Sequence, residues 1–129
     1  MSFQVKRPAN LSDLWNVFTE YPDAYPIAGG TDILPRLNQG IERHDVFVSL
    51  EGIQELRGIS FKEDGSVSIG ALTKLVEVTE APGLNIFKAL NQACSKVASP
   101  QIRNQATVGG NVLQENRCVY FNQSVSWRR

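Results

Sequence analysis

The 129-residue chain has few of the side chains that usually build a catalytic centre. It has two cysteines, Cys94 and Cys118, and a single histidine, His44. Two cysteines are too few for a disulfide framework, which favours a reducing, cytoplasmic location. A Ser-His-Asp triad would have to use His44, and no nucleophile-elbow motif accompanies it. Hydrolase chemistry is therefore disfavoured.

A net charge of either sign and a long apolar run are also absent. Thirteen basic and thirteen acidic residues cancel, so no net field attracts nucleic acid or a membrane surface. No apolar run approaches the roughly 18 residues of a membrane span, and "MSFQVKRPANL" has no signal-peptide core. The composition, 42% hydrophobic and 20% charged, is that of one ordinary globular domain. We expect no nucleic-acid and no membrane partner.

Short strands and short helices alternate along the chain. Apolar and alternating segments predict strands at 3–8, 24–27, 45–50 and 66–72. Capping and stop signals predict helices at 11–21 (capped by Asn10), at 31–40 (ended by Gly40), and from Thr73 to near Pro82-Gly83. The chain has no G-x-G-x-x-G motif, which argues against a Rossmann fold. The pattern predicts an α+β fold with mixed sheets.

The segment 84–98 has the clearest helical pattern. Leu84, Phe87, Leu90, Cys94 and Val97 recur at spacings of three and four, which gives one apolar stripe. Cys94 lies within that stripe, so we expect it to be a small buried core residue. The following segment, up to a strand-like "ATV", is expected to be loop.

Two glycine pairs follow strand-like segments, in "YPIAGGTDILPRL" (25–37) and in "QATVGGNVLQ" (105–114). Glycine is costly to order, so such pairs indicate positive φ or a close approach to the backbone. A strand that ends in glycines before a helix exposes N–H groups that attract phosphate. Asp32 would repel a phosphate, so we expect it to cap the helix or bind a ligand hydroxyl. Taken alone, the first loop favours a tight strand-to-helix turn without a ligand; the two loops together favour one ligand held by both.

Three segments carry a family resemblance: "PIAGGTDILPRL", "SIGALTKL" and "SPQIRNQATVGGNV". In order and approximate spacing they resemble the flavoprotein subunit of the molybdenum hydroxylases, the family of xanthine dehydrogenase and carbon monoxide dehydrogenase. The resemblance covers nearly the whole chain. It implies the FAD-binding fold of the PCMH type, as in CO dehydrogenase flavoproteins, with α+β lobes at 1–55 and 56–117 and the third lobe missing. It also implies two partners, a molybdenum-cofactor large subunit and a [2Fe-2S] small subunit.

The same resemblance implies which residues bind FAD. The first loop would wrap the pyrophosphate, the second would cradle a phosphate and the ribityl chain, and Val97 would lie against the flavin. The implied residues are Ile27, Ala28, Gly29, Gly30, Thr31, Asp32 and Ile33 in the first loop, and Thr107, Gly109, Gly110 and Asn111 in the second. These are backbone donors and small residues, suited to close approach rather than acid–base work, so no catalytic residue is expected.

The tail 118–129 departs from most members of the family. Where they have Ser-Pro and an aspartate that contacts the ribityl chain, this chain has Tyr120 nearby. Its "RCVYFNQS…WR" is similar to the 4-hydroxybenzoyl-CoA reductase flavoprotein subunit, whose insertion carries a [4Fe-4S] cluster, and Cys118 matches the first ligand. A cluster needs four thiolates or equivalents. We therefore expect the other ligands beyond Arg129, in a longer subunit.

The resemblance implies electron transfer in an enzyme that removes the ring hydroxyl of 4-hydroxybenzoyl-CoA or reduces a related aromatic thioester. One alternative is a xanthine or CO dehydrogenase-type flavin subunit, which passes electrons to NAD or a quinone. Another is a non-enzymatic remnant that kept the glycine turns as an interaction module. The arginines are scattered, so we expect a solvated surface for Arg36. Arg103, between the last helix and the second loop, either ties the two together or meets a diphosphate oxygen.

Overall fold

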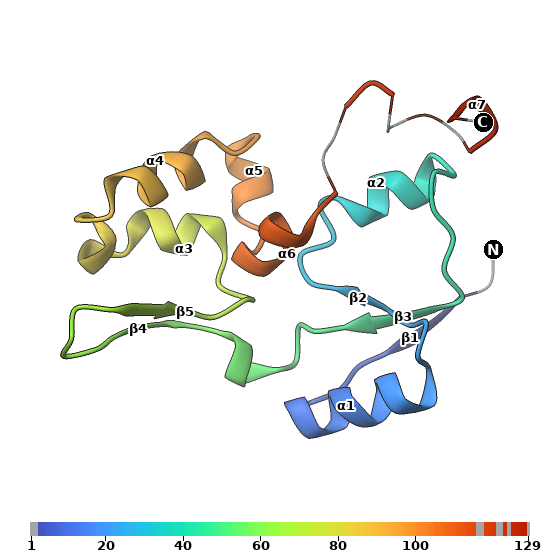
Figure 1. The fold of residues 1–129 in the computed structure, drawn as a ribbon, viewed down its shortest axis with the longest axis horizontal. Coiled ribbons are helices and arrows are strands. Elements are labelled where there is room, and N and C mark those ends of the chain that lie inside the picture. The colour runs from blue at the N-terminus through green and yellow to red at the C-terminus, as the bar shows by residue number, and fades with distance from the viewer. Residues whose placement is uncertain (1–2, 116–117, 121–122, 124, 129) are drawn as a thin grey trace.

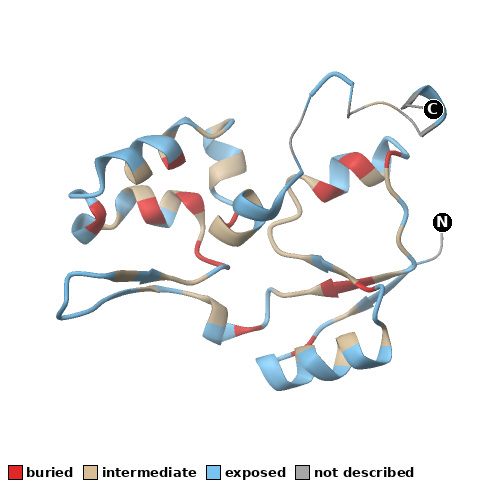
Figure 2. Ribbon diagram, viewed as in Figure 1, coloured by how far each residue is buried: buried red, intermediate tan, exposed pale blue. Residues whose placement is uncertain are grey.

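The first lobe is built on a three-stranded parallel sheet. The computed structural model describes residues 3–115, 118–120, 123 and 125–128. In sheet order the strands are β1 (Gln4–Lys6), β3 (Val46–Ser49) and β2 (Tyr25–Ile27). Helices α1 (Leu11–Glu20) and α2 (Ile33–Asn38) lie on opposite sides of this sheet (Figure 1). The central strand is therefore covered on both faces, and Phe47 and Val48 are 1% and 0% exposed (Figure 2). The buried strand predicted at 45–50 is confirmed.

Local capping signals fix the ends of the two helices in this lobe. The Asn10 side chain accepts a hydrogen bond from the Asp13 N–H at 2.8 Å, so the predicted cap of α1 is confirmed. Gly40, with φ of +68°, follows the end of α2, as predicted. Asp32 occupies the cap position of α2, but its side chain makes no capping hydrogen bond there. The capping role considered for the Asp32 carboxylate is therefore wrong, and the alternative role, binding a ligand hydroxyl, stays a prediction.

The second lobe packs helices on an antiparallel hairpin. The hairpin strands are β4 (Ile59–Phe61) and β5 (Val67–Ile69), and the helices are α3 (Leu75–Glu80), α4 (Lys88–Lys96) and α5 (Pro100–Arg103). Leu75, Val78, Leu84, Cys94 and Ala106 form its core. Cys94 is 6% exposed, which confirms the prediction that it is a core residue.

The fold keeps the predicted α+β character, but each sheet is of one kind. The strands of the first sheet are joined through helices and are parallel, whereas a tight turn joins β4 to β5 in antiparallel fashion. Mixed sheets were predicted instead. The predicted boundary between residues 55 and 56 falls in the 3₁₀ turn Gln54–Leu56; the division into domains stays a prediction. No helix in the described part of the chain is long and apolar enough to cross a bilayer.

The predicted helix over 84–98 is too long at its N-terminal end. A 3₁₀ turn (Pro82–Leu84) precedes α4, and Phe87 has non-helical ψ of 64°. The Phe61 ring of β4 packs on Gly83, where an added Cβ would lie 2.4 Å from Cζ. This packing holds the chain in a turn, and Leu84 reaches the core from the turn rather than from a helix.

The segment between α4 and the second glycine pair is also more helical than predicted. Ser99 Oγ accepts from the Ile102 N–H at 3.3 Å and Pro100 starts α5. Helix α6 (Val108–Leu113) then begins at Thr107, so Gly109 and Gly110 lie in its first turn and not in a loop. A last short helix, α7 (Val125–Arg128), lies in the tail. Figure 1 places α6 between the two lobes.

Candidate functional site

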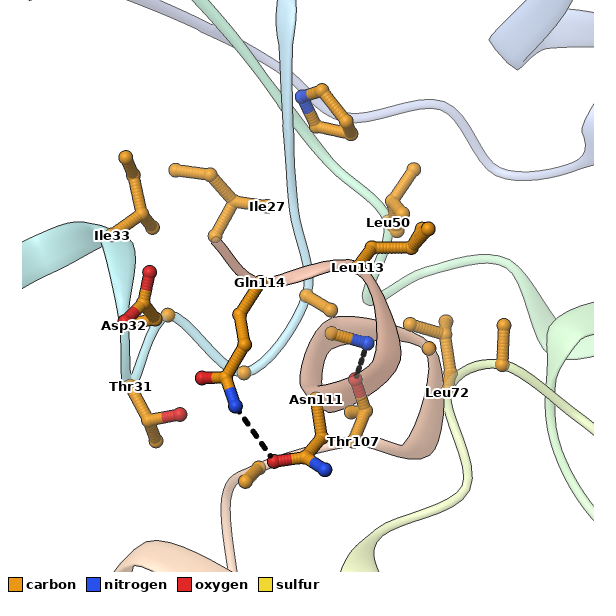
Figure 3. Close-up of a pocket in the computed structure, with 18 of the residues that line it drawn as sticks. Ile27, Thr31, Asp32, Ile33, Leu50, Leu72, Thr107, Asn111, Leu113 and Gln114 are labelled. Carbon is orange, nitrogen blue, oxygen red and sulfur yellow. Dashed lines mark hydrogen bonds between the residues drawn. The ribbon is translucent and has the colours of Figure 1, made fainter. Parts of the chain in front are cut away.

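A pocket lies between the two lobes, where both glycine segments meet (Figure 3). Its volume is about 520 Å³, within the range of small-molecule and cofactor sites. Every binding residue predicted from the sequence lines it: Ile27, Ala28, Gly29, Gly30, Thr31, Asp32, Ile33, Val97, Thr107, Gly109, Gly110 and Asn111. The sequence alone did not single out Tyr25, Pro26, Leu50, Ala71, Leu72, Ala98, Ile102, Ala106, Leu113 and Gln114, which also line it. Ala71 and Leu72 belong to the "SIGALTKL" motif, so that motif carried the signal.

The first glycine loop presents unused backbone donors to this pocket. Strand β2 ends at Ile27, and Gly30 turns the chain with φ of +71°, a left-handed conformation that glycine adopts without strain. Within the described part of the chain, the N–H groups of Ala28, Gly29, Gly30 and Thr31 donate to no acceptor. Successive free N–H groups of this kind form a concavity that attracts an anion.

Gly29 also lies at a close contact between the lobes. An ideal Cβ on Gly29 would lie 2.1 Å from the carbonyl oxygen of Gln105 and 3.3 Å from Ala106 Cα. The two backbones therefore touch where the first loop meets the chain before α6. At this position glycine is required by the fold itself, in addition to any ligand.

The second glycine pair does not offer the backbone donors that were predicted. The Gly109 N–H donates to Ala71 O at 2.8 Å, the Gly110 N–H to Thr107 Oγ1 at 3.2 Å, and the Asn111 N–H to Thr107 O at 2.9 Å. These N–H groups serve the first turn of α6 and its attachment to the second lobe. The pair contributes a small surface instead, with the Thr107 hydroxyl and the Asn111 amide beside it. Figure 3 shows Asn111 accepting from Gln114 Nε2, at 3.1 Å.

Arg103 shapes the part of the pocket wall at the end of α4. Its Nη1 donates to Val97 O at 2.8 Å and to Ala98 O at 3.3 Å. Ala98 has φ of +41°, a strained conformation for a residue with a side chain. Of the two roles considered for Arg103, the structure supports the structural tie. Val97 is half-buried and lines the pocket.

A buried ionic cluster stands behind Asp32. Arg36, 5% exposed, places Nη1 3.5 Å from Asp32 Oδ2 and Nη2 2.6 Å from Glu115 Oε2, and it also pairs with Glu42. Burial by itself would lower the pKa of Arg36. The hydrogen bond to Glu115 and the negative charges of Glu42, Glu115 and Asp32 together outweigh this effect, so the pKa of Arg36 lies above its ordinary value. The guanidinium therefore offsets the Asp32 charge. The expected solvated surface for Arg36 is wrong; its i, i+4 spacing from Asp32 was the available signal.

The chemistry of the lining suits binding rather than proton transfer. Among the described residues that line the pocket, Asp32 and Tyr25 carry the titratable side chains. Asp32 is paired with Arg36, and burial raises the pKa of Tyr25 above its ordinary value. A phenol whose pKa is raised in this way does not act as a base near neutral pH. Free N–H donors, small residues and apolar walls fit the diphosphate and the ring system of FAD.

The tail gives no structural test of the predicted cluster ligand. Cys118 is exposed, and the described residues contain no group of three or more His, Cys, Asp or Glu that could hold a metal ion. Tyr120 is exposed, with its ring centroid 6.2 Å from that of Trp127. The roles of Cys118 and of Tyr120 stay predictions, and residues 121–122, 124 and 129 of this tail lie outside the described residues.

Comparisons with known proteins agree with this site. The family model of the FAD binding domain in molybdopterin dehydrogenase matches residues 1–119. The chain is 41% identical over 107 residues to the putative xanthine dehydrogenase FAD-binding subunit XdhB of Escherichia coli (strain K12), covering 82% of this chain and 37% of that protein. It is 35% identical over 113 residues to the nicotinate dehydrogenase FAD-subunit of Eubacterium barkeri, covering 85% of this chain and 38% of that protein.

The fold agrees as well. Reconstituted CO dehydrogenase from Oligotropha carboxidovorans superposes with a TM-score of 0.81 at 30% identity, over 86% of this chain and 39% of that chain. The likeness confirms the predicted α+β fold of the CO dehydrogenase type, and the chain spans less than two fifths of the length of these relatives. With its residues 1–119 matched and its two glycine segments gathered at one pocket, the chain belongs to the family of FAD-binding domains of molybdopterin dehydrogenases.

Proposed function

We propose that this chain holds FAD between its two lobes, as the flavin-binding part of an electron-transfer subunit in a molybdenum-dependent dehydrogenase. The observation that carries the proposal is the row of unused N–H groups from Ala28 to Thr31, which faces a pocket in a chain of an FAD-binding family. A remnant that had lost its ligand would have no use for four unpaired donors beside a preformed pocket.

The two loops would hold the diphosphate in different ways. The N–H groups of the first loop would donate to its oxygens, and the turn at Gly30 keeps them pointing together. Gly109 and Gly110 would admit the ligand closely from the other side, next to the Thr107 hydroxyl. Arg36 offsets the charge of the pocket-lining Asp32 carboxylate, so the phosphates would meet less repulsion. FAD supplies one- and two-electron transfer, and the protein supplies orientation and a shaped environment.

The reaction of the whole enzyme follows from the relatives only in its class. Xanthine, nicotinate and CO dehydrogenases are named among them, which favours the dehydrogenase alternative over reductive dehydroxylation of 4-hydroxybenzoyl-CoA. One observation still supports the 4-hydroxybenzoyl-CoA reductase hypothesis: the "RCVYFNQS" segment of the tail, which contains Cys118. We infer that a molybdenum-cofactor subunit and a [2Fe-2S] subunit are the partners, with the flavin exchanging electrons with an outside acceptor such as NAD or a quinone.

A titration of the purified chain with FAD, FMN and riboflavin tests the proposal. If the first loop binds the diphosphate, FAD should bind at least about tenfold tighter than riboflavin, a difference of about 1.4 kcal/mol. FMN, with one phosphate, should fall between them. Equal affinity for FAD and riboflavin would overturn the role of the loop, and no binding of any flavin would favour the interaction-module alternative.

A further inference from the structure

A buried arginine joins the helix after the first glycine loop to the segment after the second. Arg36 lies in α2, one turn beyond pocket-lining Asp32 and Ile33, and Glu115 directly follows pocket-lining Gln114. The 2.6 Å contact between Arg36 Nη2 and Glu115 Oε2 therefore joins two segments that both line the pocket. In Figure 3, the Gln114 side chain extends from the end of α6 toward Asn111, to which its Nε2 donates.

At its other end α6 is fixed to the second lobe. The Val108 N–H donates to Thr73 O at 2.9 Å and the Gly109 N–H to Ala71 O at 2.8 Å. The C-terminal end of α6 carries Leu113 and Gln114. Both residues line the pocket, although Leu113 is 84% exposed. Such an end has few packing contacts of its own. An ion pair to the first lobe is thus placed where it controls the position of this wall.

The four charged side chains differ in exposure in a way that makes the bridge reversible. The Arg36 side chain is 6% exposed, those of Asp32 and Glu42 are 19% and 16% exposed, and that of Glu115 is 56% exposed. If Glu115 leaves, the guanidinium keeps two carboxylate partners and is not left as an uncompensated buried charge. An ion pair with a half-exposed partner also contributes little to the stability of the fold. Glu115 can therefore release and rebind at small cost.

We propose that the Arg36–Glu115 pair is a clasp that closes the pocket between the lobes over bound FAD, an inference that rests on the proposed function. When the pair is formed, Leu113 and Gln114 are held against the pocket and the ligand leaves slowly. When it opens, the end of α6 swings free of α2 and the ligand passes. Both are positioning residues, because the clasp acts through the wall and not by touching the ligand.

The test compares Glu115→Gln and Glu115→Asp with the control Glu63→Gln, which removes the same charge at an exposed position of the β4–β5 turn. FAD dissociation is followed by stopped-flow fluorescence on dilution. Glu115→Gln should raise the dissociation rate about threefold to tenfold with little change in the association rate. Glu115→Asp keeps the charge, so its FAD dissociation rate should lie between those of Glu115→Gln and wild type. The dissociation rate of Glu63→Gln should match that of wild type.

Two further measurements separate a clasp from a general loss of stability. Raising the salt concentration screens the pair, so it should speed FAD release from wild type and leave Glu115→Gln nearly unaffected. In the ligand-free chain, amide hydrogen exchange over 108–115 should be faster in Glu115→Gln, while exchange in β3 should stay unchanged. Glu115 is half-exposed, so this variant should keep the unfolding midpoint of wild type.

The outcomes are distinct. Wild-type dissociation rates and wild-type exchange in Glu115→Gln would overturn the clasp and leave FAD binding, and with it the proposed function, intact. A wild-type chain that binds no FAD would overturn both.

Discussion

Replacing Gly29 by alanine should disturb the point where the two lobes touch. The added Cβ would lie 2.1 Å from the carbonyl oxygen of Gln105, 2.8 Å from its carbonyl carbon and 3.3 Å from Ala106 Cα. All three are backbone atoms, so no side-chain rotation relieves the contact. An ordinary contact begins at 3.4 Å, and one of the two backbone segments must therefore move by more than 1 Å.

The expected loss of stability follows from what that movement displaces. Forcing extra volume into packed structure costs about 1–3 kcal/mol when the backbone must shift. Here the shifted segment also carries Ala106 O, which accepts from the Leu75 N–H at 3.0 Å in the core of the second lobe. For a chain of this size, about 2 kcal/mol corresponds to a melting temperature lowered by roughly 5–10 °C. The altered spacing of the two loops should also weaken FAD binding by about tenfold or more.

Gly52→Ala is the matched control. Its Cβ would also meet a backbone carbonyl oxygen, that of Pro8, but at 3.1 Å, and the change should cost less than about 1 kcal/mol. Urea unfolding gives the free energies, with an unchanged m-value for a folded variant, and the FAD titration gives the affinity. Equal stability and equal affinity for the two variants would refute the argument that Gly29 is required by the close approach of the lobes.

Four further outcomes are expected. Gly30→Val should abolish flavin binding while the circular dichroism spectrum stays native, because a branched side chain resists φ of +71° and a Cβ would lie 2.9 Å from Leu34 Cδ1; undiminished flavin content would contradict the assignment of this loop. Cys94→Ala should cost about one to two kcal/mol in urea unfolding, and a neutral result would contradict its place in the core. Cys94 is buried and burial raises the pKa of its thiol, whereas Cys118 is exposed. Ellman's reagent at pH 8 should therefore modify Cys118 rapidly and Cys94 only after unfolding; rapid modification of both thiols in the folded chain would contradict the burial of Cys94. The isolated chain should bind FAD weakly, with a small thermal shift at micromolar ligand, since it spans less than two fifths of the length of its relatives; stoichiometric, tightly held FAD would show that the two loops suffice.

The parts of the fold that the sequence predicted correctly depend on near neighbours in the chain. The cap of α1 needs only Asn10 and Asp13, and the end of α2 needs only Gly40. The apolar run 45–50 predicts a buried central strand without reference to its partners. The gathering of the binding residues at one pocket was predicted from ordered motifs, because each motif combines a turn with residues small enough for a close approach.

Two of the incorrect predictions depend on distant partners. The start of α4 is set by Phe61, which packs on Gly83 from another element and replaces the first helical turn with a 3₁₀ turn. The burial of Arg36 depends on Glu115, far along the chain, as well as on Asp32 one turn away. A periodic pattern contains no information about which distant side chain arrives to pack or to pair.

The two glycine pairs look alike in sequence, yet the structure gives them different tasks. Both follow a short extended segment and both lead into a helix, so the local pattern predicts free N–H groups at each. At the second pair, however, Ala71 O and the Thr107 side chain accept those hydrogens, whereas the groups from Ala28 to Thr31 meet no acceptor in the described chain. We therefore expect the attraction for a diphosphate to come from the first loop, and the second loop to contribute through its small size and its side chains. A site of this kind would depend on the distance between the lobes, because the close contact at Gly29 brings the donors of one loop and the small surface of the other to the same pocket.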